Sequence, residues 1–188
     1  MNRIVNLISD SEKKRLARYV DGLSTRKPIQ LDSGFVTLLD FDAKQITLNP
    51  YFLDLISRAI VNLARETKSN VIIGPETGGS ILVGASVELS SRWCTPMKGA
   101  VVRKNGKIIG PVRKEDKLLL VDDVINTGNT LAKTTFELFK RGLYITKAFA
   151  AIKREFPGPK WFREKTGLQC EVLVDGEEIV KKQSTIPL

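Results

Sequence analysis

A single run of thirteen residues limits what this chain can fold into more than any other part of it. Residues 118–130 have the sequence LLLVDDVINTGNT. Its four apolar residues predict a strand buried on both faces, which is typical of parallel sheets covered by helices. Two carboxylates, Asp122 and Asp123, follow the strand, and small polar residues after them open a helix. We therefore expect an anion site here, because backbone N–H groups and the helix dipole both favour negative charge at a helix start.

Strand and helix patterns alternate on both sides of this run. We expect strands at 71–73, 96–102, 117–121 and 145–152, and helices at about 80–92 and 129–141. Such alternation predicts an α/β fold, with a central parallel sheet flanked by helices. Ligands of these sheets bind at the carboxyl ends of the strands. Three loops are therefore expected on one rim of the sheet: 74–79, 103–114 and 122–130.

The N-terminal part of the chain has a different pattern. A basic helix is predicted near residues 10–22, and hairpin-like extended structure is predicted from 29 to 45. Asn49 and Pro50 predict the start of a longer helix, since asparagine caps helices and proline suits their first position.

Composition excludes several classes of function. The chain of 188 residues has no histidine, so a histidine base, a Ser-His-Asp triad and a histidine metal site are ruled out. No apolar run approaches the roughly 18 residues of a membrane span, and the N-terminus does not resemble a secretory signal. Cys94 and Cys170 are expected to be buried free thiols in a reducing cytoplasm, with a single disulfide as the alternative. The net charge of +9 predicts anionic partners.

Two further segments of the predicted rim have anion-binding patterns. Residues 74–80, GPETGGS, place three glycines where the backbone can approach an anion closely. Residues 103–107, RKNGK, place three cations around one glycine. A cationic flap between two anion loops would stabilise a departing anion and exclude water. The carboxylates of the 118–130 run fit this setting if they accept hydrogen bonds from sugar hydroxyls, which indicates a ribose 5-phosphate.

The run at 118–130 resembles the signature of the type I phosphoribosyltransferases, whose substrate is 5-phosphoribosyl 1-diphosphate (PRPP). The resemblance implies a Rossmann-like type I phosphoribosyltransferase fold, in which Asp122 and Asp123 hold the ribose 2- and 3-hydroxyls. It assigns the 5-phosphate to the loop Asn126, Thr127, Gly128, Asn129 and Thr130. Two of these residues depart from the commonest form of the signature: Asn126, where threonine is usual, and Asn129, where glycine is usual.

The glycine-rich segment at 74–80 is similar to the diphosphate loop of the orotate-type members, which often has the form G-P-E-x-G-G. The resemblance implies that Thr77, Gly78 and Gly79 line the diphosphate pocket. Some relatives have a lysine in this loop, and this chain has none.

The segment RKNGK resembles the catalytic flap R-K-x-x-K of orotate phosphoribosyltransferases, and also the R-K-x-G-K of adenine and xanthine enzymes. This implies contacts of Arg103, Lys104 and Lys107 with PRPP, and catalytic roles for Arg103, Lys107 and Asp123. It also implies a homodimer, because the flap of orotate enzymes reaches the site of the neighbouring subunit. Only nine residues separate Lys107 from Lys117, and two isoleucines stand where the orotate pattern has an Asp-His pair.

Two segments concern the nucleobase. Residues 153–155, KRE, resemble the D-R-x-E of orotate enzymes, which implies that Arg154 contacts the base. Residues 31–34, LDSG, resemble part of a small hood above the base, which implies base contacts by Ser33 and Phe35. Asp32 stands where orotate enzymes often have a lysine, and its charge would repel an anionic base.

In this interpretation, residues 1–50 form an N-terminal helix and the hood. Residues 51–188 form the PRPP-binding α/β core with a C-terminal extension, and the two parts make one structural domain.

These expectations describe a Mg²⁺-dependent enzyme that transfers phosphoribosyl from PRPP to a nucleobase, orotate being favoured, and releases diphosphate. No protein side chain is expected to bind the metal directly; PRPP and waters would hold it. Two alternatives remain open. One is a PRPP-binding RNA regulator on the same fold with little or no turnover, which the charge and the short flap favour. The other is a purine phosphoribosyltransferase that uses adenine or xanthine.

Overall fold

The computed structural model describes residues 8–24, 28–30, 34, 36–37, 40–154, 156–177 and 179. Its helices are α1 (Asp10–Leu23), α2 (Lys44–Thr47), α3 (Pro50–Glu66), α4 (Gly78–Arg92), α5 (Asn129–Phe139) and α6 (Gly158–Thr166). Its strands are β1 (Ile29–Gln30), β2 (Val36–Thr37), β3 (Val71–Pro75), β4 (Lys98–Val102), β5 (Ile108–Ile109), β6 (Lys117–Ile125), β7 (Tyr144–Lys153) and β8 (Cys170–Asp175).

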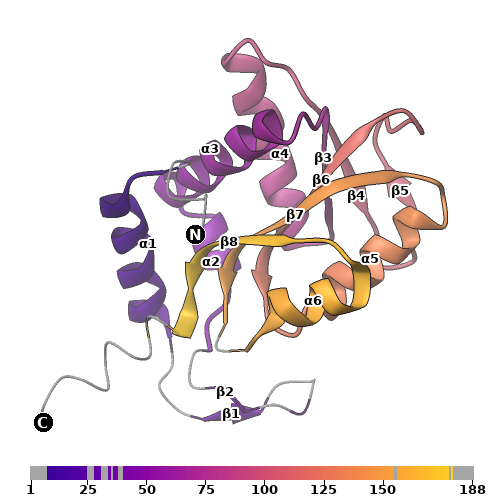
Figure 1. Ribbon diagram of the computed structural model, residues 1–188. Coiled ribbons are helices and arrows are strands. Elements are labelled where there is room, and N and C mark those ends of the chain that lie inside the picture. Colours follow the sequence, from indigo (N-terminus) through magenta and orange to yellow (C-terminus); the bar gives the residue numbers. More distant parts are fainter. Residues whose placement is uncertain are drawn as a thin grey trace, which may run out of the picture.

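The main sheet has six strands in the order β5-β4-β3-β6-β7-β8 (Figure 1). All neighbouring pairs in it are parallel except β4 and β5, which are antiparallel. Strands β1 and β2 form a separate antiparallel pair near the N-terminus. The predicted α/β class with a central parallel sheet is therefore confirmed.

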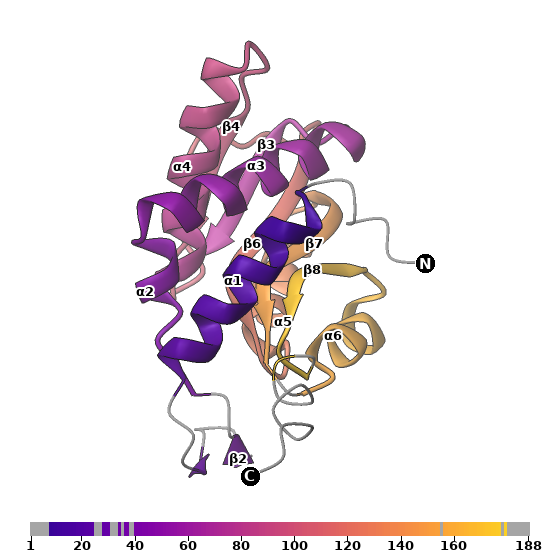
Figure 2. The ribbon, with the colours of Figure 1, turned by 90° about the vertical axis from the view of Figure 1, so that its left-hand side faces the viewer.

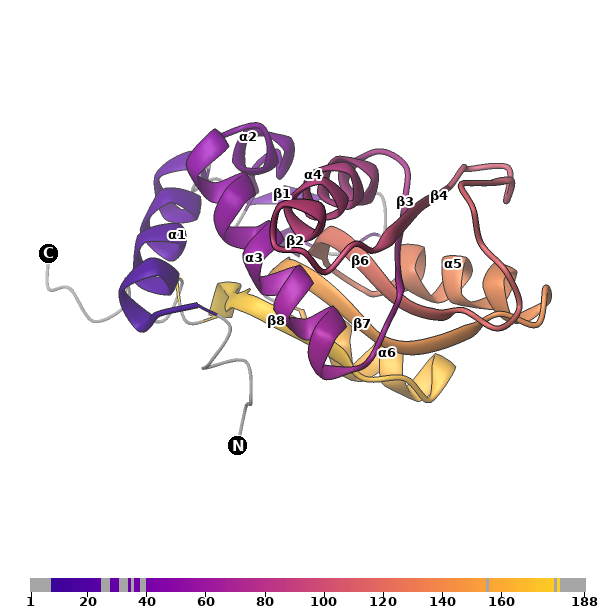
Figure 3. The same cartoon turned by 90° about the horizontal axis from the view of Figure 1, so that it is seen from above.

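Helices cover both faces of the main sheet (Figures 2 and 3). Because side chains alternate along a strand, the apolar run of β6 serves both layers. Leu119 and Val121 pack with α1, α3 and α4, whereas Leu118 and Leu120 pack with α5 and α6. All four side chains are fully buried. The sheet separates the two apolar clusters formed by the described residues. Loops that lead to helices of both layers follow the carboxyl ends of its strands.

Local capping explains where the N-terminal helices begin. At α3, the Asn49 side chain accepts hydrogen bonds from the N–H groups of Tyr51 and Phe52, as the sequence predicts. At α1, Ser9 and Glu12 form a reciprocal capping box. Glu12 also accepts a hydrogen bond of 2.7 Å from Arg58 in α3, which fixes α1 against that helix.

Several predicted boundaries were wrong. Strand β6 continues past Val121 to Ile125, because β7 supplies pairing partners as far as Lys153. The extended segment expected up to residue 45 ends earlier, since Lys44 and the residue after it lie in α2. Strand β5 was not expected; it lies where the two isoleucines follow the flap segment. No helix in the described part of the chain has both the length and the apolar character needed to cross a bilayer.

Candidate active site

A pair of buried carboxylates, Asp122 and Asp123, lies at the carboxyl edge of the sheet. The sequence pattern placed both residues in the loop after the strand, but both belong to β6. Their exposed fractions are 6% and 9%. The N–H of Asp123 donates to Oδ1 of Asp122 over 3.0 Å. Burial raises the pKa of both carboxyl groups, and the charge of Asp123 raises that of Asp122 further. Such a pair gains from ligand hydroxyls that donate to it.

Glycines bring a second backbone segment directly against this pair. A Cβ atom at Gly78 would overlap the carboxylate of Asp123, and one at Gly79 would lie 2.8 Å from the carbonyl oxygen of Val121. Gly79 also forms a backbone hydrogen bond with Asp122. Only glycine permits this approach. The glycine loop, residues 74–79, therefore lies beside the carboxylate pair, and its last two residues, Gly78 and Gly79, form the N-terminus of α4.

The predicted phosphate loop, residues 126–130, leads from β6 into α5. Gly128 has φ of +73° and directly precedes the helix. A Cβ atom there would lie 2.9 Å from the carbonyl oxygen of Gly158, so α6 packs against this turn. The first N–H groups of a helix lack intrahelical partners, and those of α5 lie at the end of the helix that adjoins this loop. Oδ1 of Asn126 is buried without a hydrogen-bond partner in the structure.

The predicted flap, residues 103–107, forms the turn of the hairpin between β4 and β5. The N–H of Arg103 donates to the carbonyl of Lys107 over 2.9 Å, and Gly106 adopts φ of +80°. Three hydrogen bonds to residues outside it hold this flap turn. Glu76 of the glycine loop accepts from Nε of Arg103 over 2.7 Å and from the N–H of Lys104 over 3.4 Å. Arg141 donates to the carbonyl of Gly106 over 2.8 Å.

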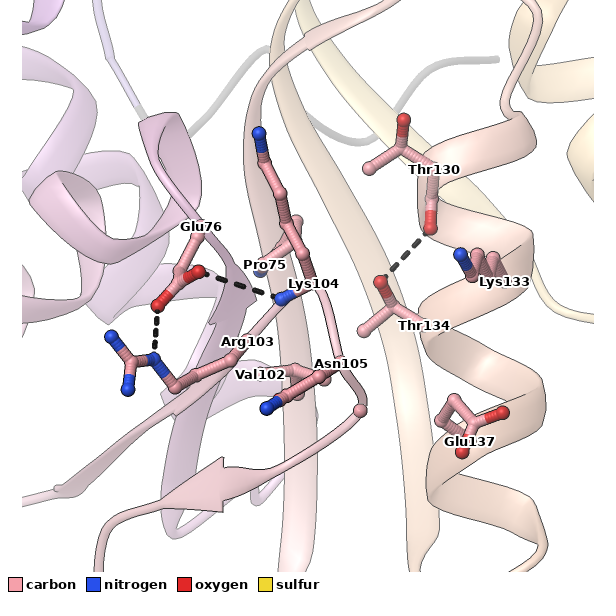
Figure 4. A pocket seen from close by; sticks show the side chains of 11 residues that line it. Pro75, Glu76, Val102, Arg103, Lys104, Asn105, Thr130, Lys133, Thr134 and Glu137 are labelled. Carbon is pink, nitrogen blue, oxygen red and sulfur yellow. Dashed lines mark hydrogen bonds and ion pairs between the residues drawn. The ribbon is translucent and has the colours of Figure 1, made fainter.

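A pocket of about 580 Å³ lies between the flap turn and α5 (Figure 4). It brings together three predicted site residues, Arg103, Lys104 and Thr130, and Lys133 of α5 also lines it. The carboxylate pair does not line this pocket. The pocket therefore extends the candidate site from the phosphate loop toward the flap turn.

On the other side of the phosphate loop, Arg154 follows β7. Its guanidinium donates to Oδ1 of Asp40 over 3.1 Å and to the carbonyl of Phe41 over 3.0 Å. It also lies over the ring of Phe41, 5.1 Å from the centroid. Arg154 thus connects the core to the N-terminal segment that was expected to form the hood. Two other predicted base-binding residues, Ser33 and Phe35, lie outside the described residues, as does Asp32.

Lys153, which stands where the family pattern has aspartate, forms ion pairs with Asp175 at 3.0 Å and Glu177 at 2.7 Å. It therefore joins the ends of β7 and β8 and takes part in a structural cluster.

Sequence reasoning missed two residues that act on the site. Glu76 holds Arg103, although nothing in GPETGGS indicated a partner on the flap. Lys44 in α2 has no motif around it, yet its positive charge opposes the rise in the pKa of Asp123 that burial causes. Both interactions join segments far apart in the chain. Both cysteines are free as expected, but the prediction that they are buried was wrong, since Cys94 is exposed and Cys170 is half-buried.

Comparison with known proteins identifies the family. No family model matches the chain. The orotate phosphoribosyltransferase of Pyrococcus horikoshii is 33% identical over 155 residues, which cover 80% of this chain and 83% of that enzyme. The chain belongs to the orotate phosphoribosyltransferase family. The enzyme of Aquifex aeolicus is 30% identical over 180 residues, covering 90% of this chain and 98% of the relative. The predicted resemblance to the orotate branch is thereby confirmed.

Solved structures support the fold. The orotate phosphoribosyltransferase of Mycobacterium tuberculosis, in complex with PRPP, has a TM-score of 0.73 at 22% identity and covers 90% of this chain and 99% of its own. The adenine phosphoribosyltransferase of Trypanosoma brucei has a TM-score of 0.65 at 15% identity, covering 92% of this chain and 84% of its own. The type I phosphoribosyltransferase fold is thus shared across members with different bases.

Proposed function

We propose that this protein transfers the phosphoribosyl group of PRPP to orotate and releases diphosphate. The carboxylate pair carries the proposal. Two adjacent buried carboxylates, closed in by glycines on one side and followed by an anion loop, are costly for folding stability when no donor reaches them. A ribose with its 2- and 3-hydroxyls free supplies these donors. Its 5-phosphate would then reach residues 126–130.

The diphosphate end of PRPP would lie on the glycine loop, where Thr77, Gly78 and Gly79 begin α4. Backbone N–H groups at a helix start stabilise negative charge. Arg103, Lys104 and Lys107 of the flap turn are proposed to supply the cations. Their charge would act most strongly as the bond between C1 and the diphosphate oxygen breaks, because the electron pair then moves to the departing group.

The new bond would form between ribose C1 and a ring nitrogen of the base. That nitrogen would lose its proton to solvent. No side chain has to act as a covalent nucleophile. The protein would act by holding the sugar and base in line and by stabilising separated charges. Asp123 would stabilise the positive charge that develops on the sugar.

Magnesium fits this site through the substrate. Within the described residues, no group of three or more acidic or cysteine side chains could hold a metal ion. Mg²⁺ commonly binds through one or two carboxylates together with substrate phosphates and waters. With the carboxylate pair occupied by the ribose hydroxyls, the diphosphate oxygens and waters would supply the ligands. The ion would neutralise part of the diphosphate charge when bound.

The base is proposed to lie between Arg154 and the hood. Support comes from the contacts of Arg154 with Asp40 and Phe41, which place a guanidinium next to the N-terminal segment. We further propose a homodimer in which Lys107 serves the neighbouring site, and a cytoplasmic enzyme of one structural domain. The exposure of Lys107 at the flap turn is compatible with that reach.

The test uses PRPP and Mg²⁺ with orotate, uracil, adenine, guanine, hypoxanthine and xanthine in turn, and follows diphosphate release. We expect release with orotate and at least tenfold slower release with the other bases. Preference for a purine would overturn the base assignment. No release with any base, together with salt-dependent RNA binding, would favour the regulator instead.

A further inference from the structure

Helix α6 approaches the phosphate loop closely and brings a lysine to it. The two helices α5 and α6 lie side by side on one face of the sheet (Figure 1). Gly128 packs against the backbone of Gly158 and against Phe162. Further along α6, the ammonium of Lys165 donates to Oδ1 of Asn129 over 2.5 Å. Asn129 is the first residue of α5, so the ammonium contacts a side chain at the very start of that helix.

Asn129 is also a residue in which this chain differs from the usual signature. Glycine, common at that position, has no side chain that can hold an ammonium. Here Oδ1 accepts from Lys165, and the amide –NH₂ of Asn129 therefore faces away from the ammonium and has no acceptor within the described part of the chain. Both groups are donors, and both lie at the end of α5 that favours anions.

Lys165 differs in this respect from the other lysine on its helix. Lys160 lies 3.9 Å from the carboxylate of Glu164, so its charge is partly neutralised. No carboxylate forms an ion pair with Lys165 among the residues that the structure describes; its hydrogen bond is to a neutral amide, which leaves the full positive charge available.

We propose that Lys165, positioned by Asn129, binds the 5-phosphate of PRPP. This inference rests on the proposed function and adds a residue to the phosphate site that lies outside the 118–130 run. Asn129 and Lys165 act as a unit. The side chain of Asn129 holds the ammonium of Lys165 beside the phosphate loop. The lysine adds a positive charge, which backbone N–H groups alone do not supply.

The first experiment compares Lys165→Gln with Lys160→Gln, both on exposed positions of α6. We expect Lys165→Gln to raise the KM for PRPP about tenfold with little change in kcat, since one charge-assisted hydrogen bond to bound phosphate is lost in ground and transition states alike. Lys160→Gln should leave KM within about twofold, as exposed pairs contribute little. Lys165→Arg should restore most of the affinity.

A second experiment tests the pairing itself. Asn129→Gly is combined with Lys165→Gln, and the affinity for ribose 5-phosphate is measured by calorimetry. If Asn129 positions Lys165, the effect of Lys165→Gln should shrink to about threefold or less in the Asn129→Gly background, because interacting residues are not additive.

Two outcomes separate the inference from the function on which it rests. Normal diphosphate release with equal PRPP affinities for Lys165→Gln and Lys160→Gln would overturn the inference alone. Failure of the unaltered protein to bind PRPP or ribose 5-phosphate would overturn both. A fall in kcat with unchanged KM would also contradict a binding role for Lys165.

Discussion

The corner between β6 and α5 and the flap turn between β4 and β5 are both predicted parts of one site, but they are built differently. At the corner, buried carboxylates lie against glycines that no larger residue could replace, and α6 packs on the outside. The flap turn is exposed and is held by one carboxylate from the glycine loop and by Arg141, which follows α5. The corner is thus determined by packing, whereas the flap turn is determined by a few polar contacts at the surface.

Because of this difference, we expect sequence variation to be tolerated better at the flap turn than at the corner. At the corner, Gly78, Gly79 and Gly128 are fixed by space as well as by chemistry. Surface contacts contribute little to stability, so the flap can shorten and lose the usual Asp-His pair without disturbing the sheet. Changes at the corner should therefore affect function much more than changes at the flap turn.

The largest effect is expected from Asp123→Asn. The amide keeps the size of the side chain but loses the charge that would face the sugar, so turnover should fall about 100-fold or more, as when a preorganised electrostatic contact is removed. Diphosphate release with PRPP and orotate measures it. Asp54→Asn, at an exposed position of α3, is the control and should retain activity. An Asp123→Asn variant that binds PRPP and turns over normally would remove the basis of the proposed function.

Gly78→Ala should have the next largest effect. Its methyl group would overlap the carboxylate of Asp123, so either that side chain or the glycine loop must move. We expect turnover to fall about 30-fold, since displacements near 1 Å in an active site are costly. Gly84→Ala is the matched control on the same helix, because a Cβ there meets nothing within 4 Å. That change should preserve activity and stabilise the helix by about 0.5–1 kcal/mol.

Asp122→Asn should raise the stability of the ligand-free protein while it lowers activity. The pKa of Asp122 is raised in the folded state by burial and by the charge of Asp123. Its favourable contribution is therefore complete below the unfolded pKa, about 3.9, and is lost as the pH rises through the folded value. The stability difference between variant and wild type should grow from pH 4 upward and reach about 1 kcal/mol or more at pH 8, because each unit of pKa shift corresponds to about 1.4 kcal/mol. Urea midpoints at several pH values measure it, and a difference independent of pH would contradict the assigned pKa shift.

Much of the fold followed from local patterns. Apolar strands and their helices were predictable because burial on both faces leaves continuous apolar runs such as that of β6. The start of α3 was predictable because Asn49 and Pro50 cap a helix using neighbouring residues only. Strand β5 was not predictable, since two isoleucines become a strand only where β4 offers a partner.

The same distinction applies to the candidate site. The carboxylate pair and the glycine loop are each a short continuous segment of the sequence. Each could therefore be predicted from its own residues. The contacts of Arg154 with Asp40 and of Arg103 with Glu76 join residues far apart in the chain, and they depend on how strands are ordered in the sheet. No local pattern contains that information.

The smallest effect, and the sharpest test of the flap turn, is expected from Glu76→Gln. The carboxylate of Glu76, which is ionised at neutral pH, accepts from Nε of Arg103, and this hydrogen bond lowers the pKa of Glu76 further. A negative charge there competes with diphosphate for Arg103. Removing it should lower the KM for PRPP about threefold at low salt, with a smaller change at high salt because the groups are exposed. Glu137→Gln, at the far end of the same pocket, is the control. If the KM rises instead, Glu76 positions Arg103 for the substrate, and the flap turn is as preorganised as the corner.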